Sequence, residues 1–130
     1  MSIFLYAGLF CAGGLGALSR YGVSKLGSRY WKKPFPLPIF MVNCLGSFVY
    51  GVLSGLFLKV LPEVLGYTDY TTWPVALILL GFLSGFTTFS TAMLESLELA
   101  RQSFWLVSQL ALWLQPVAAL MCASAGLYLI

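Results

Sequence analysis

The charged residues of this chain divide it into four long uncharged segments. Among 130 residues there are only 7 Lys and Arg and 4 Asp and Glu, so 8% of the chain is charged. A soluble domain has about a quarter of its residues charged. The uncharged segments cover residues 1–19, 34–58, 70–94 and 102–130. Each has roughly the length of about 20 apolar residues with which a helix crosses a bilayer.

We therefore predict an all-α membrane protein with a single four-helix transmembrane domain over residues 1–130, its spans lying at about 3–23, 37–60, 73–96 and 103–129. Small residues recur every fourth position in three of these spans, which is typical of closely packed helices. The three stripes are Gly8, Ala12 and Gly16; Ser47, Gly51 and Gly55; and Ala118, Cys122 and Gly126. The spans leave no room for a separate catalytic module, so we expect neither an enzyme nor a nucleic-acid partner.

The basic residues predict how the chain is oriented in the membrane. Four spans place both termini on one side, and only Lys59 lies near that side. The other basic residues lie at the first and third connections: Arg20, Lys25, Arg29, Lys32, Lys33 and Arg101. Because basic residues near span ends favour the cytoplasm, we expect both termini to be extracytoplasmic in a plasma membrane of the bacterial inner-membrane type. The basic first connection either only fixes this topology and contacts anionic lipid, or forms an electropositive mouth that gathers anions.

A polar motif interrupts the third uncharged segment. Residues 85–91 read Gly-Phe-Thr-Thr-Phe-Ser-Thr, which places three threonines and a serine near the centre of a span. Hydroxyl side chains compete with the backbone for hydrogen bonds and loosen a helix. Non-helical backbone at membrane depth is tolerated only where it is buried in protein or lines a watery path. The motif predicts that the third helix is broken near its centre for a functional reason.

Three further polar side chains lie within or near the spans. Asn43 is near the middle of the second span, where its amide must find a partner. It either bonds to a neighbouring helix or donates to a passing anion. Arg20 either extends to the interface or points into a pathway. Glu95, with Glu98 and Arg101 at spacing three, forms either a solvated pair or the mouth of a pathway, so Arg20 and Glu95 are candidate vestibule residues.

The absent residue types narrow the chemistry. The chain has no histidine, which excludes a histidine-based proton switch or metal site. Its cysteines, Cys11, Cys44 and Cys122, lie within spans without a CxxC spacing and are simplest as small apolar side chains. Proton-coupled transport usually requires an acidic or basic side chain near the centre of a span, and this chain has none there. Hydroxyls, one amide and the positive edges of phenylalanine rings remain, and these groups suit a small dehydrated anion.

These motifs together resemble the Fluc/CrcB family of fluoride channels over nearly the full length. The resemblance rests on residues 16–21 (Gly-Ala-Leu-Ser-Arg-Tyr), 42–48 (Val-Asn-Cys-Leu-Gly-Ser-Phe) with Gly51, and 85–91 with Glu95. It implies an antiparallel dimer with two pores at its interface and passive fluoride export. It also implies a third helix broken at the motif, with a central Na⁺ held by backbone carbonyls. Carried over by position, these carbonyls are those of Ser84 and Thr87.

The resemblance also implies which residues line a fluoride pore. The pore amide corresponds to Asn43 and the first pore phenylalanine to Phe89, and Ser90 and Thr91 follow as hydroxyl donors. Several positions depart from the family pattern. Ala92 stands where a second phenylalanine is usual, Ser84 replaces a glycine, and Ile39 replaces a threonine; Trp113 and Val117 replace a tyrosine and a serine.

The departures and the loop charges together favour two different subunits. A chain that inserts in one orientation cannot form an antiparallel dimer with itself, and family members occur as oppositely oriented pairs. We therefore expect a heterodimer with a homologous subunit, with one competent and one degenerate pore. One alternative is a non-conducting structural or assembly subunit. Another is a small exporter of cationic drugs, which requires a membrane-embedded carboxylate that the first span lacks.

Overall fold

The fold is a bundle of helices that run up and down past one another. A computed structural model describes residues 3–60 and 73–130. In chain order the elements are α1 (Ile3–Tyr30), α2 (Leu37–Gly55), a π-helical turn η1 (Leu56–Val60), α4 (Trp73–Phe86), α5 (Phe89–Arg101) and α6 (Trp105–Leu129). The predicted connection between the second and third spans falls largely in residues 61–72, outside the described residues.

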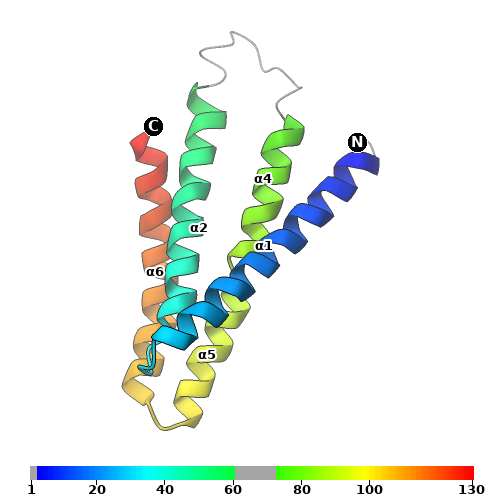
Figure 1. The fold of residues 1–130 in the computed structure, drawn as a ribbon. Coiled ribbons are helices and arrows are strands. Elements are labelled where there is room, and N and C mark those ends of the chain that lie inside the picture. The colour runs from blue at the N-terminus through cyan, green and yellow to red at the C-terminus, as the bar shows by residue number, and fades with distance from the viewer. Residues whose placement is uncertain (1–2, 61–72) are drawn as a thin grey trace.

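Four helical stretches are long and apolar enough to cross a membrane: Ile3–Tyr30, Leu37–Lys59, Leu77–Arg101 and Trp105–Leu129. The prediction of an all-α protein with four membrane-spanning helices is therefore confirmed. The first helix continues to Tyr30, beyond the expected end of its span at residue 23. Figure 1 shows that α1 begins and α6 ends at the same end of the bundle, while the α1–α2 and α5–α6 connections lie at the other end. Which end faces the cytoplasm stays a prediction.

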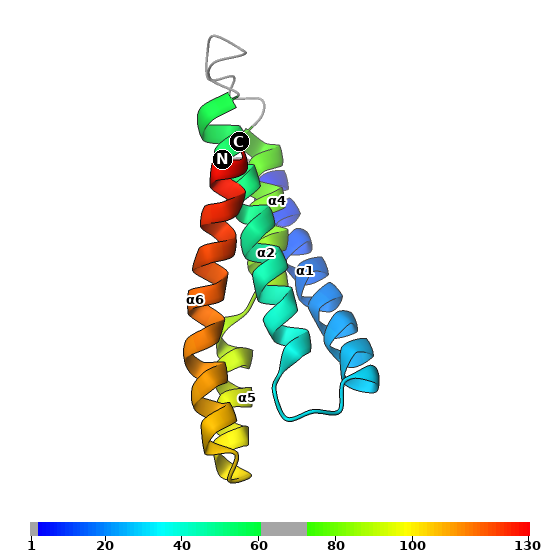
Figure 2. The same ribbon diagram turned by 90° about the vertical axis from the view of Figure 1, so that its left-hand side faces the viewer.

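The helices pack as two close pairs, α1 with α4 and α2 with α6 (Figures 1 and 2). In the second pair, a Cβ added to Gly51 would collide with the carbonyl oxygen of Ala123, and one added to Gly126 would collide with that of Phe48. The small-residue stripes of the second and fourth spans thus face each other. Since lipid supplies no hydrophobic force between helices, this backbone approach gives the van der Waals contact that holds the pair together.

The lower half of the bundle joins α5 to α6. Ser108 Oγ donates to the Ser96 carbonyl oxygen at 2.7 Å, and both residues are buried. Helix α5 ends in a Schellman turn, in which Phe104 N–H donates to Leu99 O at 2.9 Å and Ser103 takes a positive φ of 67°. This turn reverses the chain so that α6 packs back along α5, and Gln115, well inside α6, then reaches the side chain of Asn43 beside the polar motif.

The outer surface of the described helices is strongly apolar. Large side chains such as Phe4, Phe10, Leu18, Leu120 and Met121 are exposed, whereas the largest fully buried side chains are only Ile39 and Val42. In a soluble protein such a surface would aggregate, but here it matches the hydrocarbon of a bilayer. The chain is a multi-pass membrane protein.

Candidate functional site

The third hydrophobic stretch contains two helices with a non-helical step between them. Helix α4 ends at Phe86 and α5 begins at Phe89, which leaves Thr87 and Thr88 between them. Thr87 N–H still donates to Leu83 O at 2.8 Å, which extends the bonding of α4 by one residue. Thr88 then turns to extended backbone, with φ −156° and ψ 129°. The step lies close to the middle of the stretch Leu77–Arg101.

The side chain of Asn43 binds the backbone of this step. Asn43 Nδ2 donates to the Thr88 carbonyl oxygen at 2.9 Å, and Thr88 N–H donates to Asn43 Oδ1 at 2.9 Å. The carboxamide therefore pairs with both polar groups of one peptide residue, as a neighbouring strand would. An unpaired backbone group in hydrocarbon costs several kcal/mol, so this pairing is what allows the helix to open here.

The same bonds release two carbonyl oxygens from the helical pattern. In an unbroken helix, Thr88 N–H would donate to Ser84 O and Thr91 N–H would donate to Thr87 O. Thr88 N–H donates to Asn43 instead, and Thr91 N–H donates to Thr88 Oγ1 at 3.3 Å. Both carbonyl oxygens predicted as Na⁺ ligands thus lose their usual helical donors. Carbonyl oxygens freed in this way are suitable ligands for a hard cation.

The hydroxyl groups of the motif gather at the start of α5. Thr88 Oγ1 caps the helix by accepting from Thr91 N–H, and it lies 3.1 Å from Ser90 Oγ and 3.4 Å from Thr91 Oγ1. The N-terminus of a helix carries the positive end of its dipole. Ser90 and Thr91 therefore lie where an anion would be attracted, and the structure brings both close to Thr88 and hence to Asn43.

A fifth polar side chain, which the sequence did not point to, joins this cluster. Gln115 Oε1 accepts a hydrogen bond from Asn43 Nδ2 at 3.1 Å, and the residue is only 3% exposed. In the sequence, Gln115 stands out only as the residue before Pro116, where a kink is expected. The available signal was an amide within an apolar span, but Gln109 in the same span gives that signal equally.

A cavity of about 220 Å³ lies between α2, the non-helical step and α6, and Ser90 and Thr91 are not among the described residues that line it. Its lining includes Asn43, Thr87, Thr88, Phe89, Ala92 and Gln115, and no charged side chain is among the residues that line it. Phe89 lines the cavity while remaining 64% exposed on the surface of the protomer. A neutral cavity with amide groups and a ring can hold water or a small ion but offers no group for proton exchange.

The departures from the family pattern occupy two kinds of position. Ile39 and Ala92 are each 1% exposed, so both are packed inside the protomer. Trp113 and Val117 are exposed on α6. Ile39 and Ala92 therefore pack in the interior of the protomer, whereas Trp113 and Val117 lie on its outer surface.

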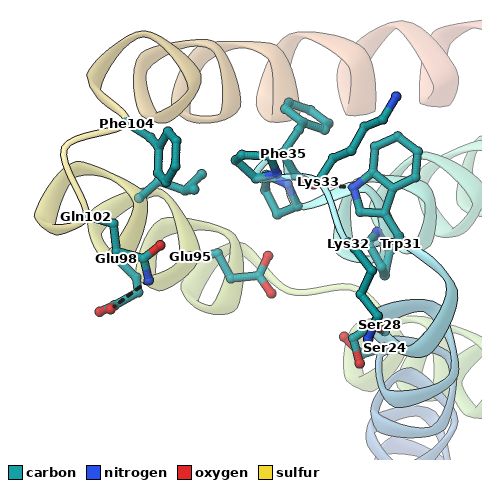
Figure 3. A pocket seen from close by; sticks show the side chains of 14 residues that line it. Ser24, Ser28, Trp31, Lys32, Lys33, Phe35, Glu95, Glu98, Gln102 and Phe104 are labelled. Atoms are coloured by element: carbon teal, nitrogen blue, oxygen red, sulfur yellow. Dashed lines mark hydrogen bonds between the residues drawn. The ribbon is translucent and has the colours of Figure 1, made fainter.

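A second cavity, of about 480 Å³, lies at the end of the bundle that holds the α1–α2 connection (Figure 3). Lys32 and Lys33 line it from the connection, and Glu95 and Glu98 line it from α5. Glu95 Oε2 is buried without a hydrogen-bond partner, and Gln102 Nε2 donates to Glu98 Oε1 at 3.2 Å. Arg20 is not among the lining residues, so the structure assembles one of the two candidate vestibule residues here and not the other.

Known proteins are similar in sequence to this chain over most of its length. The family model described as CrcB-like protein, Camphor Resistance (CrcB), matches residues 7–127. A protein of Maridesulfovibrio salexigens named fluoride-specific ion channel FluC is 36% identical over 129 residues, covering 99% of this chain and 95% of that protein. FluC 1 of Listeria monocytogenes is 38% identical over 117 residues, covering 88% of this chain and 87% of its own. FluC 2 of Brucella suis is 34% identical over 118 residues, covering 82% and 88% respectively. With a family model that matches nearly the entire chain and relatives this similar, the chain belongs to the CrcB (FluC) family of membrane proteins.

Proposed function

We propose that this chain is a subunit of a fluoride-selective channel that exports fluoride passively across the plasma membrane. The observation that carries the proposal is the non-helical step at Thr87–Thr88, paired by Asn43 beside a neutral cavity. The names of the relatives, fluoride-specific ion channels, support the choice of ion. The site has no charged side chain to trap an anion, which suits rapid passage rather than tight binding.

The interruption of the third span places the N-terminus of α5, the positive end of its helix dipole, near the middle of the stretch. Helix α5 presents its N-terminus and the hydroxyls of Ser90 and Thr91 to the middle of the stretch, which favours an anion. Fluoride must shed part of its hydration shell to pass, so neutral donors have to replace the lost water. We assign this role to Ser90 and Thr91, with the ring of Phe89 presenting its positive edge. The main role of Asn43 is to stabilise the non-helical step by pairing with the N–H and C=O of Thr88.

The carbonyl end of α4 suits a structural Na⁺. The residues present fit the ion, because the Ser84 and Thr87 carbonyls lose their helical donors to Asn43 and Thr88. When bound, the ion would supply positive charge, and the Ser84 and Thr87 carbonyl oxygens would hold it. The chain's own contribution is to leave these two carbonyl oxygens without their helical donors.

We propose further that two oppositely oriented subunits form the channel as an antiparallel dimer with pores at its interface. Phe89 and Ser90 are exposed in the isolated protomer, although both belong to the candidate pore. The basic residues of this chain favour one orientation, which argues for a homologous partner rather than a second copy. With Ala92, Ile39 and Val117 in place of family residues, one of the two pores is degenerate and the other conducts.

A fluoride-electrode efflux measurement from proteoliposomes tests the proposal, with chloride efflux as the control. We expect fluoride efflux when the chain is reconstituted with an oppositely biased homologous subunit, and little when it is reconstituted alone. Robust efflux from the chain alone would contradict the heterodimer while leaving the channel intact. Absence of fluoride efflux in both preparations would leave the non-conducting structural subunit as the function.

A further inference from the structure

Gln115 has a buried hydrogen-bond donor that none of the described residues satisfies. The side chain is 3% exposed, and its Nε2 atom is buried with no hydrogen-bond partner in residues 3–60 and 73–130. Leaving a buried amide donor unpaired destabilises a protein. A membrane protein rarely keeps such a group without a use, because water is not at hand to satisfy it. The position of Gln115 beside Asn43 therefore needs an explanation.

The surrounding bonds fix which way the Gln115 amide points. An amide's oxygen and nitrogen are told apart by their partners. Asn43 pairs with both the N–H and the C=O of Thr88, and only one orientation of its carboxamide can do so. That orientation directs a second Nδ2 hydrogen at Gln115, which must answer with its oxygen, Oε1, at 3.1 Å. The Nε2 hydrogens of Gln115 are then the ones left without an acceptor.

The cavity beside Gln115 calls for an acceptor of a particular kind. Gln115 lines the 220 Å³ cavity together with Phe89 and Ala92. No acidic side chain lines it that could accept from Nε2. An occupant that accepts hydrogen bonds and fits this volume is a small anion or a water molecule that accompanies one. The positive edge of the Phe89 ring favours the same occupant.

We propose that Gln115 is a further residue of the anion pathway, whose Nε2–H donates to a fluoride ion in this cavity while its Oε1 positions Asn43. The proposal rests on the proposed function and adds to it a residue from the fourth span. It also assigns the two amides different tasks. Asn43 uses both of its donors within the protein, on Thr88 and Gln115, whereas Gln115 keeps a donor free for the ion.

Fluoride-dependent thermal unfolding of the purified protein tests this role. The melting temperature is measured in sodium fluoride and in sodium chloride at equal ionic strength, for the wild type, Gln115→Met and Gln109→Met. Methionine matches the length of glutamine but has no amide, and Gln109 is an exposed glutamine on the same helix, so it is the matched control. We expect the wild type and Gln109→Met to be stabilised by fluoride, and Gln115→Met to need at least about tenfold more fluoride for the same stabilisation.

Two results would overturn the proposal in different ways. If Gln115→Met responds to fluoride as the wild type does, Gln115 is not in the pathway and the channel proposal stands. If the wild type shows no fluoride-dependent stabilisation and also no fluoride efflux when it is reconstituted with the homologous subunit, both proposals fall together. Should Gln115→Met not fold, Gln115→Glu decides the matter when it is measured at high pH, because the ionised carboxylate keeps an oxygen for Asn43 and has no donor. An unchanged fluoride response in Gln115→Glu would count against the proposal.

Discussion

Replacing Asn43 with aspartate should disrupt the candidate pore through the backbone it holds. The carboxamide makes three hydrogen bonds, two to Thr88 and one to Gln115. Aspartate keeps an oxygen for Thr88 N–H but puts a second oxygen where Nδ2 stood. The Thr88 carbonyl then loses its donor and faces a like partial charge, while the Gln115 amide has to turn over so that its Nε2–H donates to the aspartate.

The magnitude follows from this orphaned acceptor. It costs about 1–3 kcal/mol, so Asn43→Asp should lower the free energy of unfolding by roughly that amount, before any cost of burying the carboxylate. That is a large share of a typical total stability of about 5–15 kcal/mol. Fluoride efflux should fall strongly as well, since a carboxylate repels the anion and removes the bond that keeps the helix open.

The assay pairs thermal unfolding with fluoride efflux and uses Ser47→Ala as the control for unfolding. Ser47 lines the same cavity from the same helix, one turn beyond Asn43. We expect Ser47→Ala to lie within about 0.5 kcal/mol of the wild type if Asn43 holds the step alone. Wild-type stability together with wild-type efflux in Asn43→Asp would refute the reasoning, because the step would then not depend on this side chain.

Four other variants test the pore phenylalanine, the packing of α2 against α6 and the cap of α5. Phe89→Ile should reduce fluoride efflux and leave dimer formation, as measured by size-exclusion chromatography, unchanged. Loss of the dimer would instead mark Phe89 as a packing residue. Gly51→Val should separate α2 from α6 and lower the melting temperature, because the Cβ of the new valine would collide with the Ala123 carbonyl. Gly14→Val is the control, since a Cβ at Gly14 meets open space, and its melting temperature should stay near that of the wild type. Thr88→Ala should cost about 1 kcal/mol in thermal or denaturant unfolding by removing the cap of α5; an unchanged stability would show that the cap is replaced by another group.

The fold could be predicted from the sequence because the bilayer leaves few choices. A chain with four uncharged segments of this length must satisfy its backbone within helices, so class and span number follow from charge placement alone. Which helices pair is harder. The glycine stripes indicate close contact, but only the structure shows that Gly51 and Gly126 lie on one shared interface. Apolar helices that are uniform around their circumference carry little signal of how they rotate.

The same limit explains what was missed at the site. The motif at residues 85–91 and the amide of Asn43 are conspicuous in an apolar sequence, but their bond joins residues 45 positions apart. Gln115 and Gln109 look alike in the sequence, yet the packing of α6 buries one and exposes the other. Burial of a polar side chain in a membrane helix depends on its rotation against neighbours, which is set by contacts along the whole helix.

The arrangement of polar groups at the step argues that a single protomer is incomplete. Ser84 and Ser90 are exposed close to the middle of a membrane-spanning stretch, and Phe89 between them is 64% exposed. Asn43 and Gln115 satisfy the inner side of the step, facing α2 and α6. On the outer side, the hydroxyls of Ser84 and Ser90 bond only within the third stretch, to Leu80 O and Thr88 Oγ1, and no other helix among the described residues supplies a partner. Acyl chains offer no donors or acceptors for freed carbonyls and hydroxyls, so lipid is a poor cover for this side. We infer that a second subunit covers it, and that the opening of the third span is stable because both of its sides are enclosed by protein.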